Sequence, residues 1–442
     1  MRTAIIGAGP AGLFLGSALA RRGHQVTAVD RDPGPDDETT WARRGVMQFH
    51  HAHSFRQTVA DALRREVPEA YDGWLALGAE PVTGEVTAAP TTSVGVRSRR
   101  ETFERALRVA ACTTPGFEVR RGHVDAVVER GGRAAGLVVD GAVLDADLVI
   151  DASGRNGRAT RSLGDRAGVG GPCGQAYVDR IYRLHDGAEP GPMTSPVAWS
   201  ADCDGYLCLI FPHERGLFSV VMIRSLDDPG LRDLRHEAAF SAAAQAIPGL
   251  SEWTDPARSA PVTDVLPGGP LLNVYRAQSR DDGSLVLPGL FFVGDSMATT
   301  TPVFGRGITT TLWQCEALLS LLDHDPDDLD GVGLAFDSWA DDEMRPWVED
   351  HIHMDAARVE RWSGRDVYAD AGLPSDAILA AAEIRPEIMA RAGPYLQMAA
   401  LPASLRAVEP VAREVYDGGW RPAYAPGPTR SELRAIVAEA LA

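Results

Sequence analysis

The 442-residue chain contains no lysine, so each of its 43 basic residues is an arginine. Without lysine the chain has no access to Schiff-base or other lysine chemistry. The basic residues are outnumbered by 61 acidic ones, which gives a net charge of −18. Nucleic acids and anionic membrane surfaces are bound through a basic footprint, so we expect neither as a partner.

Cysteines and long apolar runs are also scarce. Five cysteines without tight pairing suggest a reducing compartment. Cys203 and Cys208 lie in DCDGYLCLIF, whose alternation predicts a structural strand rather than a redox pair. No apolar run is long enough for a membrane span, and Arg2 already leads into a strand rather than a signal peptide. We therefore predict a cytoplasmic protein.

The chain opens on a pattern that is typical of dinucleotide binding. Residues 3–6 form an apolar run that ends in the turn GAGPAG at 7–12, and residues 13–22 continue as a helix. A second apolar strand at 26–29 is closed by Asp30, 18 residues after the last glycine. Strand, glycine-rich turn, helix, strand and acid thus occur in the expected order and at the expected distances.

Each glycine of this turn has its own physical role. Gly7 permits the tight turn, Gly9 lets the backbone approach a pyrophosphate, and Gly12 allows the helix to pack closely on the strand. The N-terminus of the helix offers free N–H groups and a positive dipole to phosphates. Asp30 can accept both hydroxyls of an adenosine ribose, and it would repel a 2′-phosphate.

A similar strand–turn–helix pattern recurs near residue 290. Residues 290–293 read as an apolar strand, and the GRG turn at 305–307 opens a helix whose apolar residues recur at steps of three and four. Asp295 stands, like Asp30, at the carboxyl end of a strand, where doubly wound sheets bind ligands. Its carboxylate can bind polyol hydroxyls, and the first amides of the helix can face an electron-rich ring oxygen.

These two segments resemble the principal FAD fingerprints of flavin monooxygenases with the para-hydroxybenzoate hydroxylase fold. Two further stretches, residues 44–53 (RGVMQFHHAH) and 151–155 (DASGR), indicate a closer resemblance to bacterial polyether epoxidases and related tailoring oxygenases. The motifs cover roughly the first 340 residues and are more specific for the fold than for the reaction. The resemblance implies an FAD-dependent monooxygenase of secondary metabolism (natural product biosynthesis). It would hydroxylate or epoxidise a hydrophobic small molecule through a flavin C4a-hydroperoxide.

The resemblance also implies a set of FAD contacts, carried over position by position. The ADP half would contact Gly7, Gly9, Ala11, Gly12 and Asp30. Arg31 and the backbone of Val124 would lie at the adenine, and Arg100 would reach back to the cofactor. Asp295 would hold the ribitol or pyrophosphate, and the isoalloxazine would be bordered by Pro302, Gly305, Gly307 and Ile308. Apart from the resemblance, Arg44 is a candidate contact to flavin or substrate. No catalytic side chain is assigned, and no metal site is predicted.

The chain departs from this group near its third strand. Enzymes of the fold that take hydride directly from NAD(P)H usually carry Asp-Gly-x-x-Ser-x-x-Arg there. Here Ser153 replaces the aspartate, Gly157 replaces the serine, and Arg161 falls one place late. The electron donor is therefore left open between NAD(P)H directly and NAD(P)H through a separate flavin reductase. Flavin-dependent halogenases share the fold and resemble one another in a WxWxIP segment and in a lysine between flavin and substrate. This chain has neither the segment nor any lysine, which disfavours halogenation.

Several polar and aromatic residues have two interpretations. His50, His51 and His53 are predicted to be structural or flavin-adjacent rather than metal ligands. His351 and His353 are predicted to form the polar face of a helix. Arg43, with its neighbour Arg44, would either touch the flavin or be solvated. Candidate pocket residues, each equally consistent with plain core, are Trp199, Tyr206, Phe211 and His213.

The predicted fold class is α/β. A Rossmann-like FAD-binding domain of the glutathione-reductase type would occupy 1–165, with an excursion towards the substrate near 81–94, and 281–345. An antiparallel β-sheet substrate domain would be inserted at 166–280. A helical C-terminal region, 346–442, would cap the pocket or mediate homodimerisation.

Two other functions are alternatives to the monooxygenase. One is an FAD-dependent reductase or dehydrogenase of the same fold that does not use oxygen. The other is a flavin-binding protein without turnover, a sensor or scaffold; no DNA-binding or signalling module accompanies it in the sequence, which ranks it last. A requirement for oxygen distinguishes the first two.

Overall fold

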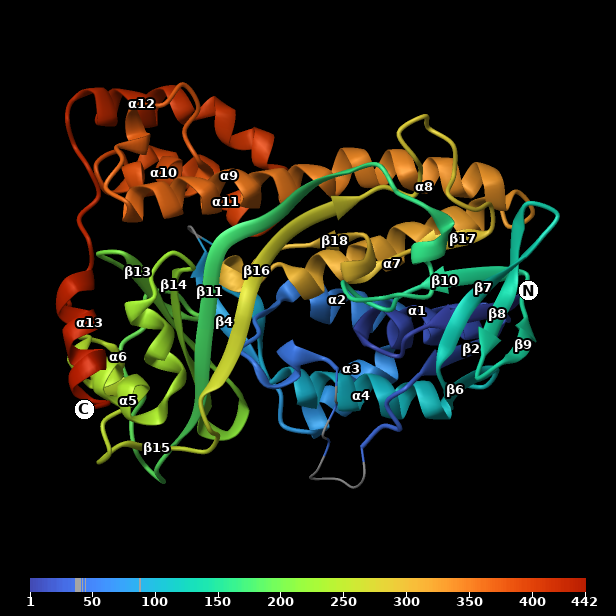
Figure 1. The fold of residues 1–442 in the computed structure, drawn as a ribbon, viewed down its shortest axis with the longest axis horizontal. Coiled ribbons are helices and arrows are strands. Elements are labelled where there is room, and N and C mark those ends of the chain that lie inside the picture. The colour runs from blue at the N-terminus through green and yellow to red at the C-terminus, as the bar shows by residue number, and fades with distance from the viewer. Residues whose placement is uncertain (36–40, 42, 44, 87–88) are drawn as a thin grey trace.

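The computed structural model describes residues 1–35, 41, 43, 45–86 and 89–442. It confirms the predicted fold class: a parallel sheet with helices on it, a second, antiparallel sheet and a helical C-terminal region (Figure 1). Within the described residues, no helix combines the length and apolar character needed to cross a membrane.

The parallel sheet has five short, mostly buried strands in the order β17-β10-β1-β2-β6. Ile6 at the end of β1 pairs with Asp151 on one side and Val29 on the other. Asp151 in turn pairs with Phe292. The carboxyl ends of four strands therefore meet at one edge of the sheet. The five strands of the sheet are β1 (Arg2–Ile6), β2 (Gln25–Asp30), β6 (Phe117–Arg121), β10 (Leu148–Asp151) and β17 (Leu290–Phe292).

The helix α1 (Pro10–Arg21) begins and ends where its sequence requires. Pro10 occupies the first turn, where its missing N–H costs nothing, and Gly23 follows the helix with φ +86°. Almost all of α1 is buried, which its apolar composition allows on every face. Gly16 faces the Phe117 ring, 2.4 Å from where a Cβ would stand, so the helix lies directly on the sheet. Three helices pack against it: α2 (Gln57–Glu66), α4 (Arg100–Thr113) and α7 (Gly307–His324). Outside these, α3 (Pro68–Ala76) packs on α2 and α4, and α8 (Leu329–Glu343) packs on α7.

The antiparallel sheet is organised by two long strands, β11 (Gly168–Leu184) and β16 (Leu266–Arg276), which run side by side across the molecule (Figure 1). β16 also pairs with β18 (Ala298–Thr299), which follows β17 closely in the chain. The sheet thereby reaches the carboxyl edge of the parallel sheet. Its other strands are β12 (Trp199–Cys203), β13 (Tyr206–Pro212), β14 (Leu217–Ser225) and β15 (Ser259–Pro261).

The cysteine-containing segment is a hairpin, so the prediction of one strand was wrong in this detail. Cys203 ends β12 and Cys208 lies in β13, with Asp204-Gly205 as the connecting turn. Asp-Gly is a strong hairpin signal, so the sequence contained the information. Both thiols are buried and free, in keeping with the structural role predicted for them.

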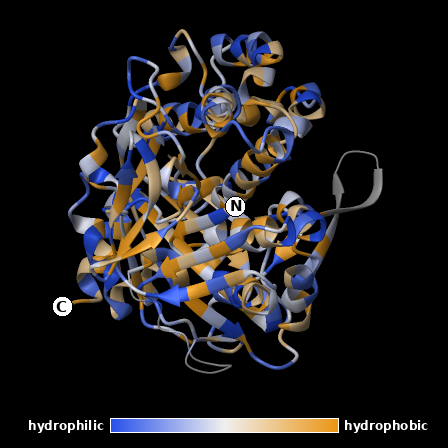
Figure 2. Ribbon diagram, turned by 90° about the vertical axis from the view of Figure 1, so that its right-hand side faces the viewer, coloured by the Kyte–Doolittle hydropathy of each residue, from blue (hydrophilic) through white to orange (hydrophobic). Residues whose placement is uncertain are grey.

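Two small sheets and the C-terminal helices complete the fold. One small sheet has the strand order β3 (Phe55–Arg56), β5 (Ala89–Arg97), β4 (Glu80–Val86). The other has the order β7 (Val124–Arg130), β8 (Arg133–Val139), β9 (Ala142–Asp145). The antiparallel sheet buries its outer face against α5 (Glu237–Ala246), α6 (Leu250–Trp253) and α13 (Arg430–Glu439). The remaining helices are α9 (Arg345–Trp362), α10 (Ser375–Ala380), α11 (Glu387–Leu396) and α12 (Glu409–Asp417). Hydrophobic residues gather on the central strands, whereas the outer helices carry both kinds of residue (Figure 2).

Candidate functional site

A cavity of about 760 Å³ lies where the two sheets meet. It is lined by the turn after β1, the loop after β10, the segment after β17 and the facing part of the antiparallel sheet. Its volume is within the range of ligand-binding sites. Of the predicted cofactor residues, the lining contains Gly7, Gly9, Ala11, Asp30, Arg31, Arg100, Val124, Asp295, Pro302, Gly305, Gly307 and Ile308. The sequence thus grouped residues that are up to 301 positions apart in the chain and share one cavity. Arg44 lies outside the described residues.

The glycines of the first turn differ in what surrounds them. Gly7 has φ +99°, which disfavours a side chain. Gly12 does not line the cavity: a Cβ there would lie 2.0 Å from the carbonyl oxygen of Gly7. Gly9 does line it, and a Cβ there would meet the Arg43 guanidinium alone, at 3.8 Å. Gly12 therefore serves the packing of α1, whereas Gly9 leaves backbone open to a ligand.

Asp30 is fixed by its surroundings with its side chain 18% exposed. Its Oδ2 accepts from the amide of Ala8 at 2.7 Å and from Nη2 of Arg43 at 3.0 Å. Its Oδ1 accepts from the amide of Asp32 at 2.9 Å. Arg43 is buried, so the alternative of a solvated arginine is wrong for this residue. No local sequence pattern ties Arg43 to Asp30, because the two residues are 13 positions apart in the chain.

A buried charge cluster connects Arg43 with a second cavity-lining arginine. Glu104, on α4, is fully buried and accepts from Nη1 of Arg43 and from Nε of Arg100, the latter at 2.5 Å. Burial lowers the pKa of Arg100 to about 10, so its guanidinium stays charged at neutral pH. Glu104 therefore holds two cations at the cavity wall, a role that the sequence analysis missed.

His53 continues this cluster towards the antiparallel sheet. Its Nδ1 lies 3.0 Å from the carbonyl oxygen of His51, and its Nε2 lies 3.3 Å from Nη1 of Arg100. Nδ1 must therefore donate and Nε2 accept. Burial, and then Arg100, lower the pKa of His53 well below its usual range. His53 is thus a neutral ring with both nitrogens occupied.

His51 and His50 face other surroundings. His51 is buried, with Nδ1 2.9 Å from Oδ1 of Asp179 on β11. The other Asp179 oxygen accepts from the amide of Ala52 at 2.8 Å. The His51 ring also meets the ring of Tyr177 edge to face, at 4.9 Å between centroids. His50 is exposed. Residues 51 and 52 are thereby held against β11 of the antiparallel sheet, which covers the cavity.

The apolar part of the cavity is formed by the antiparallel sheet. Tyr177, Phe211, Leu271 and Leu272 line it, and the first three belong to a small hydrophobic cluster on that face of the sheet. Burial raises the pKa of Tyr177 well above its usual range, so its phenol is neutral and able to donate a hydrogen bond. Among the predicted pocket residues, Phe211 lines the cavity, whereas Trp199 and Tyr206 belong to the core on the opposite face.

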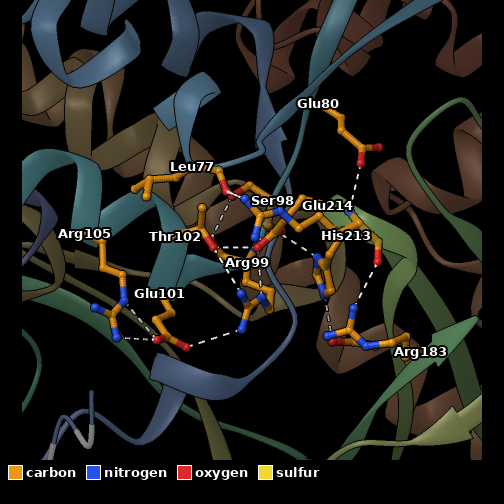
Figure 3. A network of polar contacts seen from close by, with 12 residues as sticks. Leu77, Glu80, Ser98, Arg99, Glu101, Thr102, Arg105, Arg183, His213 and Glu214 are labelled. Atoms are coloured by element: carbon orange, nitrogen blue, oxygen red, sulfur yellow. Dashed lines mark hydrogen bonds and ion pairs between the residues drawn. The ribbon is translucent and has the colours of Figure 1, made fainter. Parts of the chain in front are cut away.

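His213, the fourth predicted pocket residue, lies instead at the joint between β13 and α4 (Figure 3). Its Nδ1 donates to the carbonyl of Ser98 at 3.1 Å, and its Nε2 accepts from Ser219 at 2.8 Å. The neighbouring Glu214 accepts from the backbone amide and Nε of Arg99 at 2.7 and 2.9 Å. A carboxylate from one sheet thus caps a helix that packs on the other.

This joint predicts an acid-sensitive stability. Burial lowers the pKa of His213 to about 4, whereas an unfolded histidine titrates near 6.5. Between these values the unfolded chain binds a proton that the folded chain does not, so lowering the pH lowers the free energy of unfolding. We expect urea unfolding at pH 7.5 and 5.0 to show a smaller difference in His213→Gln than in the wild type. Equal differences in the two proteins would contradict this assignment.

The loop after β10 adds positive charge. Asp151 accepts from the amide of Ser153 at 2.9 Å and from the Thr160 hydroxyl at 2.7 Å, which fixes the loop. Three arginines of the loop line the cavity and form no ion pair within the described residues: Arg155, Arg158 and Arg161. In a chain of net charge −18, this concentration of positive charge favours an anionic ligand.

These residues fit FAD. The helices α1 and α7 both begin at the cavity without a side-chain cap, so their first amides are available to phosphate or ring oxygens. Cβ atoms at Gly154 and Gly307, two further lining residues, would meet nothing within 4 Å, so backbone is open there too. Asp30 and Asp295 can accept ribose and ribitol hydroxyls. Burial raises the pKa of Asp295, and Arg100, Arg155 and Arg276 oppose that rise.

Residues 2–110 match the family model of FAD dependent oxidoreductases. Among curated proteins, D-amino acid dehydrogenase 2 of Ralstonia nicotianae is 41% identical over 51 residues, which is 12% of each chain. The chain therefore matches only about an eighth of the length of such relatives.

Solved structures of flavoenzymes are similar over most of the chain. The flavin-dependent brominase Bmp2 aligns over 95% of this chain and all of its own, with a TM-score of 0.66 and 15% identity. PqsL, a probable FAD-dependent monooxygenase from Pseudomonas aeruginosa, aligns over 83% of this chain and all of its own, with a TM-score of 0.58 and 14% identity. The fold is thus that of these flavoenzymes, and the first part of the chain is similar in sequence to FAD dependent oxidoreductases.

Proposed function

We propose that this chain is an FAD-dependent monooxygenase that hydroxylates or epoxidises a hydrophobic small molecule. The observation that carries the proposal is a single cavity with two different halves. One half has open glycine backbone, uncapped helix ends and arginines, and the other has the apolar wall of Tyr177, Phe211 and Leu271. A cofactor and an apolar substrate would meet where the halves join.

In this proposal each half has a defined task. Asp30 and Arg31 hold the adenosine part of FAD, the α1 N-terminus and Arg100 hold its phosphates, and the α7 N-terminus faces its ring. FAD, when bound, supplies the electron transfer and the activation of oxygen. The apolar wall excludes water and orients the substrate, and the neutral hydroxyl of Tyr177 can donate a hydrogen bond to it.

The electrons would come from NAD(P)H, either directly or through a separate flavin reductase. The arginines of the loop after β10 offer phosphate contacts for a direct donor, although that loop lacks the usual motif. A rate of flavin reduction that saturates with NADH or NADPH would support the direct route. Reduction only when a flavin reductase is added would support the partner.

Oxygen reactivity tests the proposal. FAD-loaded protein, reduced anaerobically with dithionite and mixed with oxygenated buffer, should pass through a transient absorbance distinct from both reduced and oxidised flavin. With a turned-over substrate, ¹⁸O₂ should label the product. Direct return to the oxidised spectrum, with substrate oxidised or reduced anaerobically, would overturn the proposal in favour of a reductase or dehydrogenase. The short match to D-amino acid dehydrogenases is the observation that favours this second candidate.

A second experiment tests for halogenation, because a flavin-dependent brominase has a similar fold. Bromide added to the same reaction with an electron-rich trap should give no brominated product, since the chain has no lysine. A brominated product would move the assignment to a halogenase. Failure of the wild type to bind FAD would overturn the cofactor assignment itself.

A further inference from the structure

The segment that borders the second half of the cofactor site is fastened on its outer side. Gly305 and Gly307 line the cavity, but the side chain between them, Arg306, is 2% exposed and lies outside the lining. Gly305 has a left-handed backbone conformation, with φ +59°. At this turn the backbone of the two glycines faces the cavity, while the Arg306 side chain lies on the other side of the segment. The sequence analysis noted the GRG turn without finding what its arginine binds.

Arg306 enters a cage made largely by the C-terminal helices. Its Nη1 donates to Oδ2 of Asp350 on α9 at 2.9 Å. Its guanidinium carbon lies 4.6 Å from the ring centroid of Trp347 and 4.9 Å from that of Tyr395 on α11. A buried guanidinium is stable only when a carboxylate and further polar or aromatic groups replace its water. The position of Arg306 therefore depends on the C-terminal helices.

Asp350 is the centre of this cage. Besides Arg306, it accepts from the hydroxyl of Ser375 at 2.5 Å and from that of Tyr395 at 2.7 Å. The donors come from the start of α7, from α10 and from α11. One carboxylate thus joins three C-terminal helices to the turn at the cavity.

Two further side chains, those of Arg56 and Thr301, fasten the same segment. Arg56 donates to the carbonyl oxygen of Phe304 at 2.8 Å and to that of Leu396, at the end of α11, at 2.6 Å. The Thr301 hydroxyl lies 2.8 Å from Oδ2 of Asp355 and 3.0 Å from Nδ1 of His351, both on α9. The hydroxyl donates to the carboxylate, so Nδ1 of His351 donates to the hydroxyl. His351 lies on a polar stripe of α9 with Asp355 and Arg358, but this stripe is buried and not solvated.

We propose that the C-terminal helices act as a buttress for the flavin-binding turn, and that Asp350 and Tyr395 are positioning residues that set its geometry through Arg306. This inference rests on the proposed FAD site. It gives residues 346–396 a role that differs from capping the pocket or forming a dimer. Because neither residue lines the cavity, both act through the turn and not by touching the cofactor.

The test compares Asp350→Asn and Tyr395→Phe with Glu349→Gln in the full-length chain. Glu349 is the adjacent residue on α9, half exposed and paired with Arg345, so it is a matched control. Asp350→Asn keeps the shape and removes the charge, whereas Tyr395→Phe removes the hydroxyl that contacts Asp350 and the sulfur of Met354 and keeps the ring. Thermal melting identifies a variant that does not fold. If Asp350→Asn does not fold, the results for Tyr395→Phe decide whether the proposal holds.

We expect amides of residues 299–308 in the FAD-free protein to exchange hydrogen about tenfold faster in both variants than in the control. We also expect the dissociation constant of FAD to rise about tenfold and the visible absorbance of bound flavin to shift. Unchanged exchange, affinity and spectrum in folded variants would overturn the buttress. Faster exchange in a chain whose wild type binds no FAD would instead refute the cofactor assignment and leave the buttress intact.

Discussion

Replacing Glu104 by alanine is expected to lower the free energy of unfolding by about 3–5 kcal/mol. Glu104 is fully buried between Arg43 and Arg100, and its removal leaves two buried guanidiniums next to each other without their shared anion. Such an uncompensated charge is more costly than the loss of packing alone. Arg43 keeps Asp30 as a second partner, which places the expected effect within this range and not above it. Urea denaturation at neutral pH measures it.

Glu101 provides the matched control on the same helix. It pairs with Arg105 and Arg99, and its side chain is 13% exposed, whereas that of Glu104 is fully buried. Arg99 keeps Glu214 as a partner when Glu101 is removed, so Glu101→Ala should be milder than Glu104→Ala. Two variants of equal stability would show that the buried cluster is not what holds this wall of the cavity.

Alanine at Gly9 and at Gly12 should separate ligand binding from folding. At Gly12 the added Cβ would lie 2.0 Å from a backbone oxygen, which cannot move without displacing α1. We expect Gly12→Ala to be destabilised by about 1–3 kcal/mol or more, because the clash exceeds the roughly 1 kcal/mol by which alanine favours a helix. Thermal melting of the FAD-free protein measures this loss.

Gly9→Ala should melt like the wild type, because its Cβ meets nothing closer than 3.8 Å. The methyl group would project into the cavity, where the backbone is expected to approach the pyrophosphate. A steric penalty of about 1–3 kcal/mol weakens FAD binding about 10- to 100-fold. Flavin fluorescence titration measures it. Wild-type affinity in Gly9→Ala would place the phosphates elsewhere in the cavity.

The sequence predicted best where the contacts are local. The β1–α1–β2 unit occupies fewer than 30 residues, and its glycines, helix start and acid follow from steric and dipole rules that act within the motif. The carboxyl-edge placement of Asp295 followed from the same rules. Whether these residues bind FAD stays a prediction, which the variants above test.

The sequence failed where partners are distant or a helix is covered on two sides. Arg43 and Glu104 are 61 residues apart, and no pattern links them. On α9, His351, Asp355 and Arg358 recur at helical spacing and are all buried, because the helix lies between β11, β16 and the other C-terminal helices. Periodicity identifies the polar stripe of such a helix, but it does not say that the stripe is buried against polar partners.

The sequence by itself determined the α/β fold, and it predicted a dinucleotide-type cofactor and the edge of the sheet where ligands would bind, because glycine turns and strand ends impose their geometry locally. Only the tertiary structure decided which arginines are held at the cavity, which aromatic residues form its apolar wall and what the C-terminal helices support. Those outcomes depend on burial and on charge pairing between distant segments. Both are properties of the packed chain, since a guanidinium or an imidazole acquires its partner and its protonation state only when water is removed around it.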